Sequence, residues 1–180
     1  MLKLKNNSYL REFTVSDTDE LFNLIDSNRK YLSTYLAWVK NVNHPVDTEW
    51  FINKCTEEGK EGYPTFGIFI DEKLAGVISY HVINKANKRT SLGYWIGKSF
   101  SGNGLVTMSV KALLKNGFEN LDLNRIAIHC AVCNIASQNI PKKLGFTEEG
   151  IEREAEIIDG KFYDHVIYSM LKSEFKNLKD

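Results

Sequence analysis

The chain has 180 residues, of which 43% are hydrophobic and 26% are charged, and its 23 basic residues balance its 23 acidic residues. A chain of this length buries about 70% of its unfolded surface, so it folds without disulfides or metals. We expect a single domain over residues 1–180. The zero net charge and the lack of a signal peptide or a long apolar run predict no nucleic-acid partner, no membrane partner and a cytoplasmic location.

Cysteine and histidine usage gives no metal or disulfide framework. Cys55, Cys130 and Cys133 form an odd set, which is typical of a reducing compartment. Cys130 and Cys133 spell C-x-x-C, but they fall in an expected strand, where residues three apart point to opposite faces. The histidines have no partners at ligand spacing, so we expect no metal site.

The first part of the chain combines a short strand with helices. Residues 9–13 predict the strand, and Asp17 with Glu20 three residues later resembles a capping box. Apolar residues at helical spacing then predict two short helices with a break near residues 27 and 28. A third helix is expected over residues 47–57, with its buried side formed by Trp50, Phe51 and Cys55.

Aromatic residues are dense between the second and third expected helices. Tyr31, Tyr35 and Trp38 lie close together in the sequence. Core packing is the preferred interpretation and the wall of a substrate site is the alternative, because large aromatic side chains serve in both.

The rest of the chain alternates strands and helices. Asp159 and Gly160 form the strongest turn signal, since Asp-Gly between two apolar runs is typical of a tight hairpin. The end of the chain, residues 172–180, is polar, and we expect it to be frayed. Period-two patterns predict strands over 66–70, 74–83, 90–96, 126–133, 147–158 and 162–171, and helical patterns cover 105–120 and 135–144. We expect one α+β domain with a mixed sheet.

A candidate anion site follows the strand that ends at Ile96. Gly102 and Gly104 remove side chains from the loop, so that backbone N–H groups can face a phosphate. The helix expected from Leu105 adds a partial positive charge at its N-terminus. G-x-G alone is a weak signal, and the Rossmann and Walker patterns do not fit, because Thr107 replaces the third glycine and no G-K-[ST] follows.

Several motifs in this order resemble the GNAT family of N-acetyltransferases. They are Gly93-Tyr94-Trp95, the glycine loop, Asn134-x-x-Ser137 and Leu144-Gly145-Phe146. Residues 29–38 and the end of the chain, with Glu149-Gly150, Arg153-Glu154, Asp164 and Tyr168, are similar to the ribosomal-protein serine acetyltransferases of the RimL type. The resemblance implies a GNAT-type, mostly antiparallel sheet with two splayed strands and flanking helices.

The resemblance also implies acetyl-CoA as co-substrate, held between the splayed strands. Asn134 matches the asparagine that binds the pantetheine arm, and its alternative role is a helix N-cap. The open edge of the strand near Ile96 would supply N–H donors to the oxyanion. The implied cofactor-binding residues are Trp95, Ile96, Gly102, Asn103, Gly104, Leu105, Val106, Thr107, Asn134 and Ser137.

The implied catalytic residues are Ser137 and Glu156. Ser137 matches the residue that protonates the departing thiolate, and Tyr168 is the alternative acid. Glu156 falls where this branch holds the water that deprotonates the amine, and its alternative is an exposed glutamate paired with a nearby base. A base is required because an ammonium has no lone pair with which to attack the thioester.

Four positions depart from the pattern of the family. Ser101 and Val106 change the phosphate loop, and Ser91 replaces a glutamate that is an alternative base. Pro141 stands where many relatives have a tyrosine, and a proline inside a helix costs about 3 kcal/mol, so we expect a kink or restart near Asn139.

The resulting prediction is an acetyl-CoA-dependent N-acetyltransferase that acts on the N-terminal amine of a protein or peptide. Acetylation of a small amine, such as a polyamine, an amino acid or an antibiotic, is the alternative activity. A CoA-binding module without catalysis is the alternative from another class. The resemblance also implies a homodimer.

Overall fold

The computed structural model of the chain describes residues 1–175. Backbone contacts group them into two compact units. The first unit contains residues 1–79 and 94–109, and the second contains the remaining described residues. The single domain expected over residues 1–180 stays a prediction.

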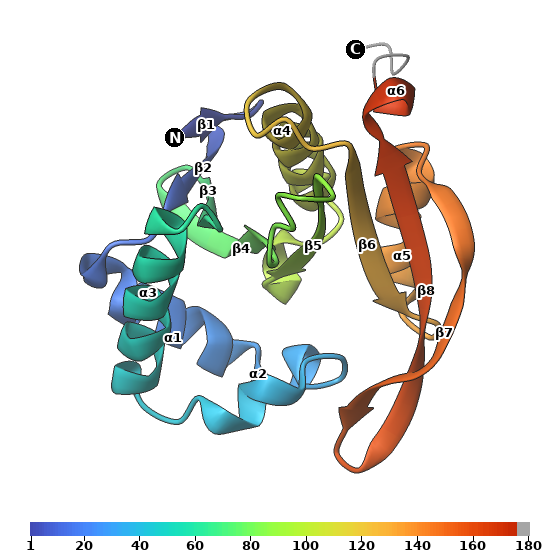
Figure 1. Cartoon of the computed structure of the whole chain (residues 1–180). Helices are drawn as coiled ribbons and strands as arrows, with labels where there is room; N and C mark the ends of the chain where they lie inside the picture. Colours follow the sequence, from blue (N-terminus) through green and yellow to red (C-terminus); the bar gives the residue numbers. More distant parts are fainter. Residues whose placement is uncertain (176–180) are drawn as a thin grey trace. The chain divides into compact units, whose positions relative to one another are not determined.

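Strands that pair mainly in the antiparallel direction form the sheet (Figure 1). Within the described residues the hydrogen-bonded order is β1-β2-β3-β4-β5-β6-β8-β7. Neighbours from β1 to β4 are antiparallel, β5 and β6 are parallel, and β8 is antiparallel to both β6 and β7. The expected α+β class with a mixed, mostly antiparallel sheet is confirmed. The strands are β1 Leu2–Lys3, β2 Ser8–Glu12, β3 Thr65–Ile70, β4 Lys73–Tyr80, β5 Arg89–Ile96, β6 Arg125–Ala131, β7 Thr147–Ile158 and β8 Lys161–Leu171.

Helices lie between the strands along the described chain, and a short one follows the last strand. The expected break near residues 27 and 28 is confirmed, because Asn28 separates α1 from α2. The start of the polar end forms α6, and residues 176–180 of the expected frayed segment lie outside the described residues. The helices are α1 Thr18–Ser27, α2 Arg29–Leu32, α3 Pro45–Lys60, α4 Leu105–Glu119, α5 Ile135–Lys143 and α6 Lys172–Phe175, and 3₁₀ turns cover Val15–Asp17, Ala37–Asn41 and Lys98–Phe100.

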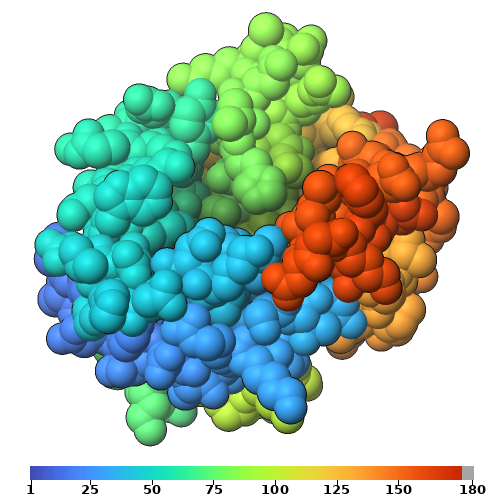
Figure 2. Space-filling view, turned by 90° about the horizontal axis from the view of Figure 1, so that it is seen from below, coloured from blue at the N-terminus to red at the C-terminus, as the bar shows by residue number. Residues whose placement is uncertain are grey.

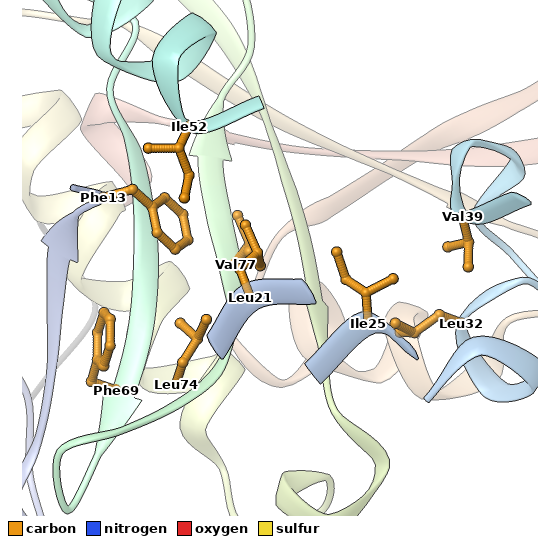
Figure 3. Packing of buried hydrophobic residues seen from close by; sticks show 9 residues of the cluster. All are labelled: Phe13, Leu21, Ile25, Leu32, Val39, Ile52, Phe69, Leu74 and Val77. Carbon is orange, nitrogen blue, oxygen red and sulfur yellow. The ribbon is translucent and has the colours of Figure 1, made fainter. Parts of the chain in front are cut away.

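The core of the first unit lies between its strands and helices α1 and α3 (Figure 3). Helix α3 contributes the buried Ile52 and Cys55, but Trp50 is 65% exposed, so the expectation that Trp50 lies on the buried side is wrong. The helix begins two residues earlier than expected, at Pro45, and its buried face is formed by Thr48, Ile52 and Cys55 at helical spacing, which leaves Trp50 outside it. The cluster consists of Phe13, Leu21, Ile25, Leu32, Val39, Ile52, Phe69, Leu74 and Val77.

The expected capping box of Asp17 and Glu20 is also wrong. Asp17 is 4% exposed and accepts a 2.8 Å hydrogen bond from the backbone N–H of Thr14, so it caps the preceding 3₁₀ turn. Arg11 donates two hydrogen bonds of 2.7 Å to the same carboxylate. Glu20 instead accepts from the backbone N–H of Leu74, at 2.7 Å. Both carboxylates therefore join helix α1 to strands of the first unit.

The second unit contains the long hairpin of β7 and β8 (Figure 1). Asp159 and Gly160 both have left-handed φ angles, 49° and 77°, as the predicted Asp-Gly turn requires. Gly117 lets α4 approach β6, since a Cβ there would lie 2.7 Å from Cδ1 of Ile126. The helix also accepts a 2.6 Å hydrogen bond from the buried Tyr80 hydroxyl at the carbonyl of Leu113. The close approach at Gly117 packs α4 against β6, and the hydrogen bond joins α4 to Tyr80 at the end of β4.

Two expectations for the segment around α5 need correction. Strand β6 ends at Ala131, whose carbonyl accepts a turn hydrogen bond from Asn134, so Cys133 lies beyond the strand and is exposed while Cys130 is buried. Helix α5 is continuous through Pro141, so the restart expected near Asn139 is absent from this described segment. Pro141 is the seventh residue of this nine-residue helix and is buried, and its packing offsets the missing hydrogen bond.

Candidate active site

The glycine loop of the first unit has the geometry of an anion site. Gly102 and Gly104 have φ angles of 85° and 75°, a left-handed conformation that favours glycine. The first hydrogen bond of α4 runs from the N–H of Met108 to the carbonyl of Gly104, at 2.9 Å. The N–H groups of residues 105–107 precede that bond, so they have no partner within the helix and can donate to a phosphate. The loop residues thus fit the diphosphate of an acyl-CoA.

The strand that leads into this loop is fixed by a close backbone approach to β4. The N–H of Gly97 donates a 2.8 Å hydrogen bond to the carbonyl of Ala75. A Cβ on Gly76 would lie 2.2 Å from the carbonyl oxygen of Trp95, so no other residue fits there. Trp95 and Ile96 are half-buried where β5 ends. The end of β5 is therefore held in place before the phosphate loop begins.

The aromatic segment of the first unit remains at the surface. Tyr31 is 39% exposed and Trp38 is 37% exposed, and the neighbouring apolar residues Leu32 and Val39 fill the core instead. The segment 29–41 lies on the face shown in light blue in Figure 2. The ring of Trp38 lies 5.9 Å from that of Trp95. These positions favour a substrate wall over core packing for Trp38.

In the second unit, Asn134 and Ser137 are joined at the start of α5. Asn134 is the N-cap, and its side-chain oxygen accepts a 3.1 Å hydrogen bond from the N–H of Ser137. The N-cap role is therefore present, and it leaves the other end of the amide for a ligand. The hydroxyl of Ser137 lies 3.2 Å from Sγ of Cys130 on β6. Ser137 is half-buried at this contact.

Tyr168, the alternative acid, is engaged by other groups. It is 1% exposed, and its hydroxyl lies 3.0 Å from the carboxylate of Glu148 and 3.2 Å from the amide oxygen of Gln138. Burial, together with the hydrogen bond to Glu148, raises the pKa of Tyr168 to about 12. The hydroxyl of Tyr168 thus already donates to an internal acceptor, whereas the hydroxyl of Ser137 lies beside Sγ of Cys130, and this difference in partners favours Ser137.

Glu156 lies on β7 beside a histidine of β8. Its Oε2 is 3.2 Å from Nε2 of His165, and the two side chains are 38% and 16% exposed. The glutamate therefore has the nearby base that its alternative interpretation names. A paired carboxylate can still act as a base, because an oxygen that faces solvent stays free to accept a proton.

Ser137 and Glu156 belong to opposite faces of the sheet of the second unit. Ala131 pairs with His165 in the register of β6 and β8, and paired residues share a face. Cys130 precedes Ala131 in the strand and so points to the other face, where it meets Ser137. The candidate acid and the candidate base thus approach from different sides of β6.

Ser91, which replaces the alternative glutamate base, is bound to a histidine. Nδ1 of His81 lies 2.9 Å from its hydroxyl oxygen, and the ring covers Gly93, where a Cβ would lie 2.5 Å from Nε2. Burial, with the nearby His129, lowers the pKa of His81. His81 is therefore neutral at physiological pH.

Neither a metal-binding cluster nor a membrane-spanning helix is found in the part of the chain that the structure describes. No group of three or more histidine, cysteine or acidic side chains converges there. No helix there is long and apolar enough to cross a bilayer.

The fold and these residues define a class of enzyme. Acyl transfer from a CoA thioester needs an anion site for the diphosphate, a proton donor and a base, and the glycine loop, Ser137 and Glu156 are the candidates for these roles. The family model described as the acetyltransferase (GNAT) domain matches residues 8–147, which span both compact units. The chain belongs to the GNAT family of acetyltransferases.

Known relatives cover almost the whole chain. The ribosomal-protein-serine acetyltransferase of Escherichia coli (strain K12) is 28% identical over 94% of this chain and 96% of its own. The solved structure of RimL, the ribosomal L7/L12 α-N-protein acetyltransferase, with coenzyme A has a TM-score of 0.91 at 29% identity, covering 94% and 97% of the two chains. The microcin C7 self-immunity acetyltransferase MccE, solved with acetyl-CoA and AMP, has a TM-score of 0.88 at 32% identity and covers 93% of each chain.

The predictions of the RimL-like branch, of an acetyl-CoA-dependent N-acetyltransferase and of acetyl-CoA as co-substrate are confirmed by these relatives. The family match ends at residue 147, before most of the β7–β8 hairpin. The role of Glu156 therefore lies outside the family model and rests on the resemblance to the RimL branch and on the contacts of the hairpin.

Sequence reasoning missed the polar partners of the site. His165, His81 and His129 gave no signal, because their partners are distant in the sequence or depend on strand register. Gln138 is another omission, since it is 5% exposed on α5 and donates a 2.7 Å hydrogen bond to the carbonyl of Val132. Its spacing from Asn134 is helical, which is the signal that could have indicated a second anchor of α5.

Proposed function

We propose that this enzyme acetylates the N-terminal α-amine of a protein or peptide, of the ribosomal-protein type. The likeness to RimL, with a TM-score of 0.91 over 94% of this chain, is the observation that carries the proposal. Two of the reported relatives are named for ribosomal-protein substrates, which supports a cytoplasmic location. The predicted homodimer is a separate proposal that sedimentation analysis tests.

The proposed acid and base are Ser137 and Glu156, the residues that the resemblance implies. Glu156, half-buried on the hairpin, accepts the proton of the ammonium directly or through one water. Ser137 protonates the thiolate from the other face of β6, because Tyr168 already donates to an internal acceptor. Two different protons are therefore involved: Glu156 takes one from the ammonium, and Ser137 gives its own hydroxyl proton to the departing thiolate.

The residues proposed to hold the cofactor are those that the resemblance implies. The amides of residues 105–107 and the loop of Gly102, Asn103 and Gly104 would bind its diphosphate. Asn134 would bind the pantetheine arm through its free amide end, and backbone groups of Trp95 and Ile96 would bind near the thioester. Bound there, acetyl-CoA supplies the activated acetyl group.

The nature of the base favours an α-amine. Near pH 7 roughly a tenth of an α-amine with a pKa near 8 is neutral, but only about one part in a few thousand of a lysine amine. A carboxylate that is half-exposed and shared with a histidine is modest machinery for deprotonating lysine. The exposed Trp38 and Tyr31 can contact the first side chains of an acceptor peptide.

A small-molecule acceptor is the second candidate. MccE, solved with acetyl-CoA and AMP, is 32% identical to this chain. The exposed ring of Trp38 could stack on the adenine ring of a nucleotide acceptor.

CoA-thiol release with a panel of amines tests the proposal. The panel contains peptides that begin with Ser or Ala, a lysine peptide, spermidine, an aminoglycoside and an aminoacyl nucleotide. We expect turnover on the free N-termini and a loss of about 100-fold or more in Glu156→Gln. Turnover confined to a small amine would favour the second candidate, and acetyl-CoA binding without any turnover would favour a binding module.

A further inference from the structure

The β7–β8 hairpin contains an irregularity that decides which side chains meet. Residues near the turn pair regularly, up to Glu156 opposite Tyr163, but the next pair is Glu152 opposite His165. Four steps on β7 therefore match two on β8. Glu154 lies in the extra segment with a left-handed φ of 53°, and its N–H donates a 2.8 Å hydrogen bond to Asp164.

Glu156, Glu152 and His165 lie on the same face of the hairpin, and the bulge places Glu152 instead of Glu154 opposite His165. Directly paired residues share a face, and residues two apart on β8 do so as well. Glu156 Oε2 lies 3.2 Å from Nε2 of His165. The Nε2 atom is fully buried although the side chain as a whole is 16% exposed. The polar end of the imidazole thus points inward at Glu156.

The contact fixes the position of a hydrogen atom. A carboxylate oxygen has no hydrogen to donate, so a buried Nε2 at 3.2 Å is favourable only if it carries one. The contact is an ion-pair distance and not a hydrogen bond, since Nε2 has no hydrogen-bond partner among the described residues. Such contacts between a base and its neighbour commonly tighten when the substrate binds.

The other charged groups nearby have partners of their own. Glu152, opposite His165 in the register, lies 3.4 Å from Nδ1 of His129 on β6. Asp164, next to His165, accepts from the bulge at Glu154. On β6 the residue opposite His165 is Ala131, which carries no charge. Glu156 is therefore the carboxylate that pairs with Nε2 of His165.

We propose that His165 is a positioning residue that holds the carboxylate of Glu156 in the orientation needed to accept the proton of the amine. The inference rests on the proposed role of Glu156 as the base. Without the imidazole, the side chain of Glu156, which is 38% exposed, can rotate toward solvent. A base displaced by about 1 Å loses on the order of 100-fold in rate.

Two substitutions of His165 and one matched control test the proposal in the full-length enzyme. His165→Leu removes the donor at similar volume, and His165→Gln returns an N–H near the position of Nε2. His129→Leu is the control, because it breaks the other histidine–glutamate pair on the same face. Acetyl-CoA affinity by calorimetry and thermal unfolding show that each variant is folded.

We expect His165→Leu to lower kcat about 10- to 100-fold, with KM for acetyl-CoA unchanged, and His165→Gln to restore most of the rate. His129→Leu should retain the rate of the parent. Equal losses in His165→Leu and His129→Leu, or no rescue by glutamine, would overturn the positioning role.

A double variant separates this inference from the proposed function. If Glu156→Gln is slow and His165→Leu adds nothing to it, the two residues act as one unit. If Glu156→Gln is fully active, the base assignment itself fails. If Glu156→Gln is slow but His165→Leu alone is fully active, only the positioning role fails.

Discussion

The hydroxyl of Tyr168 lies 3.0 Å from the carboxylate of Glu148, so the tyrosine of the second unit already has an acceptor for its proton. Its pKa is raised to about 12 by burial and by that carboxylate. The hydroxyl of Ser137 lies 3.2 Å from Sγ of Cys130. The structure therefore distinguishes two candidate acids that the sequence left open.

This difference predicts the behaviour of two variants. Ser137→Ala should lower kcat at least about tenfold with little change in acetyl-CoA affinity. Tyr168→Phe should stay close to the parental rate while losing about 1–2 kcal/mol of unfolding free energy, because Glu148 and Gln138 lose a buried partner. Steady-state kinetics and urea unfolding measure both, and a larger loss of kcat in Tyr168→Phe would make the tyrosine the acid.

The glycine loop should be sensitive to backbone conformation alone. A Cβ at Gly102 would meet nothing within 4 Å, but its φ of 85° is strained for alanine. Gly102→Ala should cost about 1–2 kcal/mol in the loop and weaken acetyl-CoA binding correspondingly. Gly62→Ala is the matched control, with a φ of 97° and equally open space, and it should lose stability without losing affinity. Equal affinities for acetyl-CoA in the two variants would exclude the loop from cofactor binding.

The exposed tryptophan of the first unit should act on the acceptor. Trp38→Ala removes a ring that is 37% exposed and lies 5.9 Å from Trp95. We expect KM for an acceptor peptide to rise about tenfold while the Kd of acetyl-CoA stays unchanged. Trp50→Ala is the control, because Trp50 is 65% exposed on α3. A rise in the acceptor KM that is equal in both variants would remove Trp38 from the substrate wall.

Acid stability should depend on the pair of Arg125 and Glu149. Two hydrogen bonds from Arg125, opposed by partial burial and aided by Ser169, lower the pKa of Glu149 to about 2. Its folded pKa is below its unfolded pKa, so the stabilisation is complete above about pH 5 and is lost as the pH falls toward 2. The Glu149 side chain is 38% exposed, so solvent screening reduces the contribution to about 1 kcal/mol.

Arg125→Met tests this pH dependence. Its unfolding free energy should be lower than that of the parent at pH 7, and the difference should shrink between pH 5 and pH 2. Urea titrations at several pH values measure it. If the difference in unfolding free energy stays constant down to pH 2, packing of the aliphatic part of Arg125, and not its charge, stabilises the fold.

Local signals predicted much of the fold. The Asp-Gly turn at residues 159 and 160 has the expected left-handed angles, and the loop of Gly102 and Gly104 lies where a strand passes into a helix, as predicted. These features depend on a few adjacent residues whose backbone conformation is restricted. The start of α3 and the exposure of Trp50 were predicted wrongly, because periodicity alone does not select which face of a helix meets the core.

The partner of Glu156 could not be predicted for a similar reason. A regular hairpin extended from the Asp-Gly turn would place Glu154 opposite His165, whereas the bulge places Glu152 there. The bulge depends on a left-handed Glu154 held by Asp164, a tertiary hydrogen bond with no sequence signature. The capping role of Asp17 was missed likewise, because its main partner is Arg11 on β2.

The proposed function requires that the N-terminal nitrogen of the acceptor receives the acetyl group. The most direct measurement is tandem mass spectrometry of a peptide that carries a free N-terminal serine and one internal lysine, after reaction with the enzyme and acetyl-CoA. We expect the acetyl group on the N-terminal nitrogen alone, and no acetylated product from the same peptide with a blocked N-terminus. Acetyl on the lysine side chain, or equal modification of the blocked peptide, would contradict it.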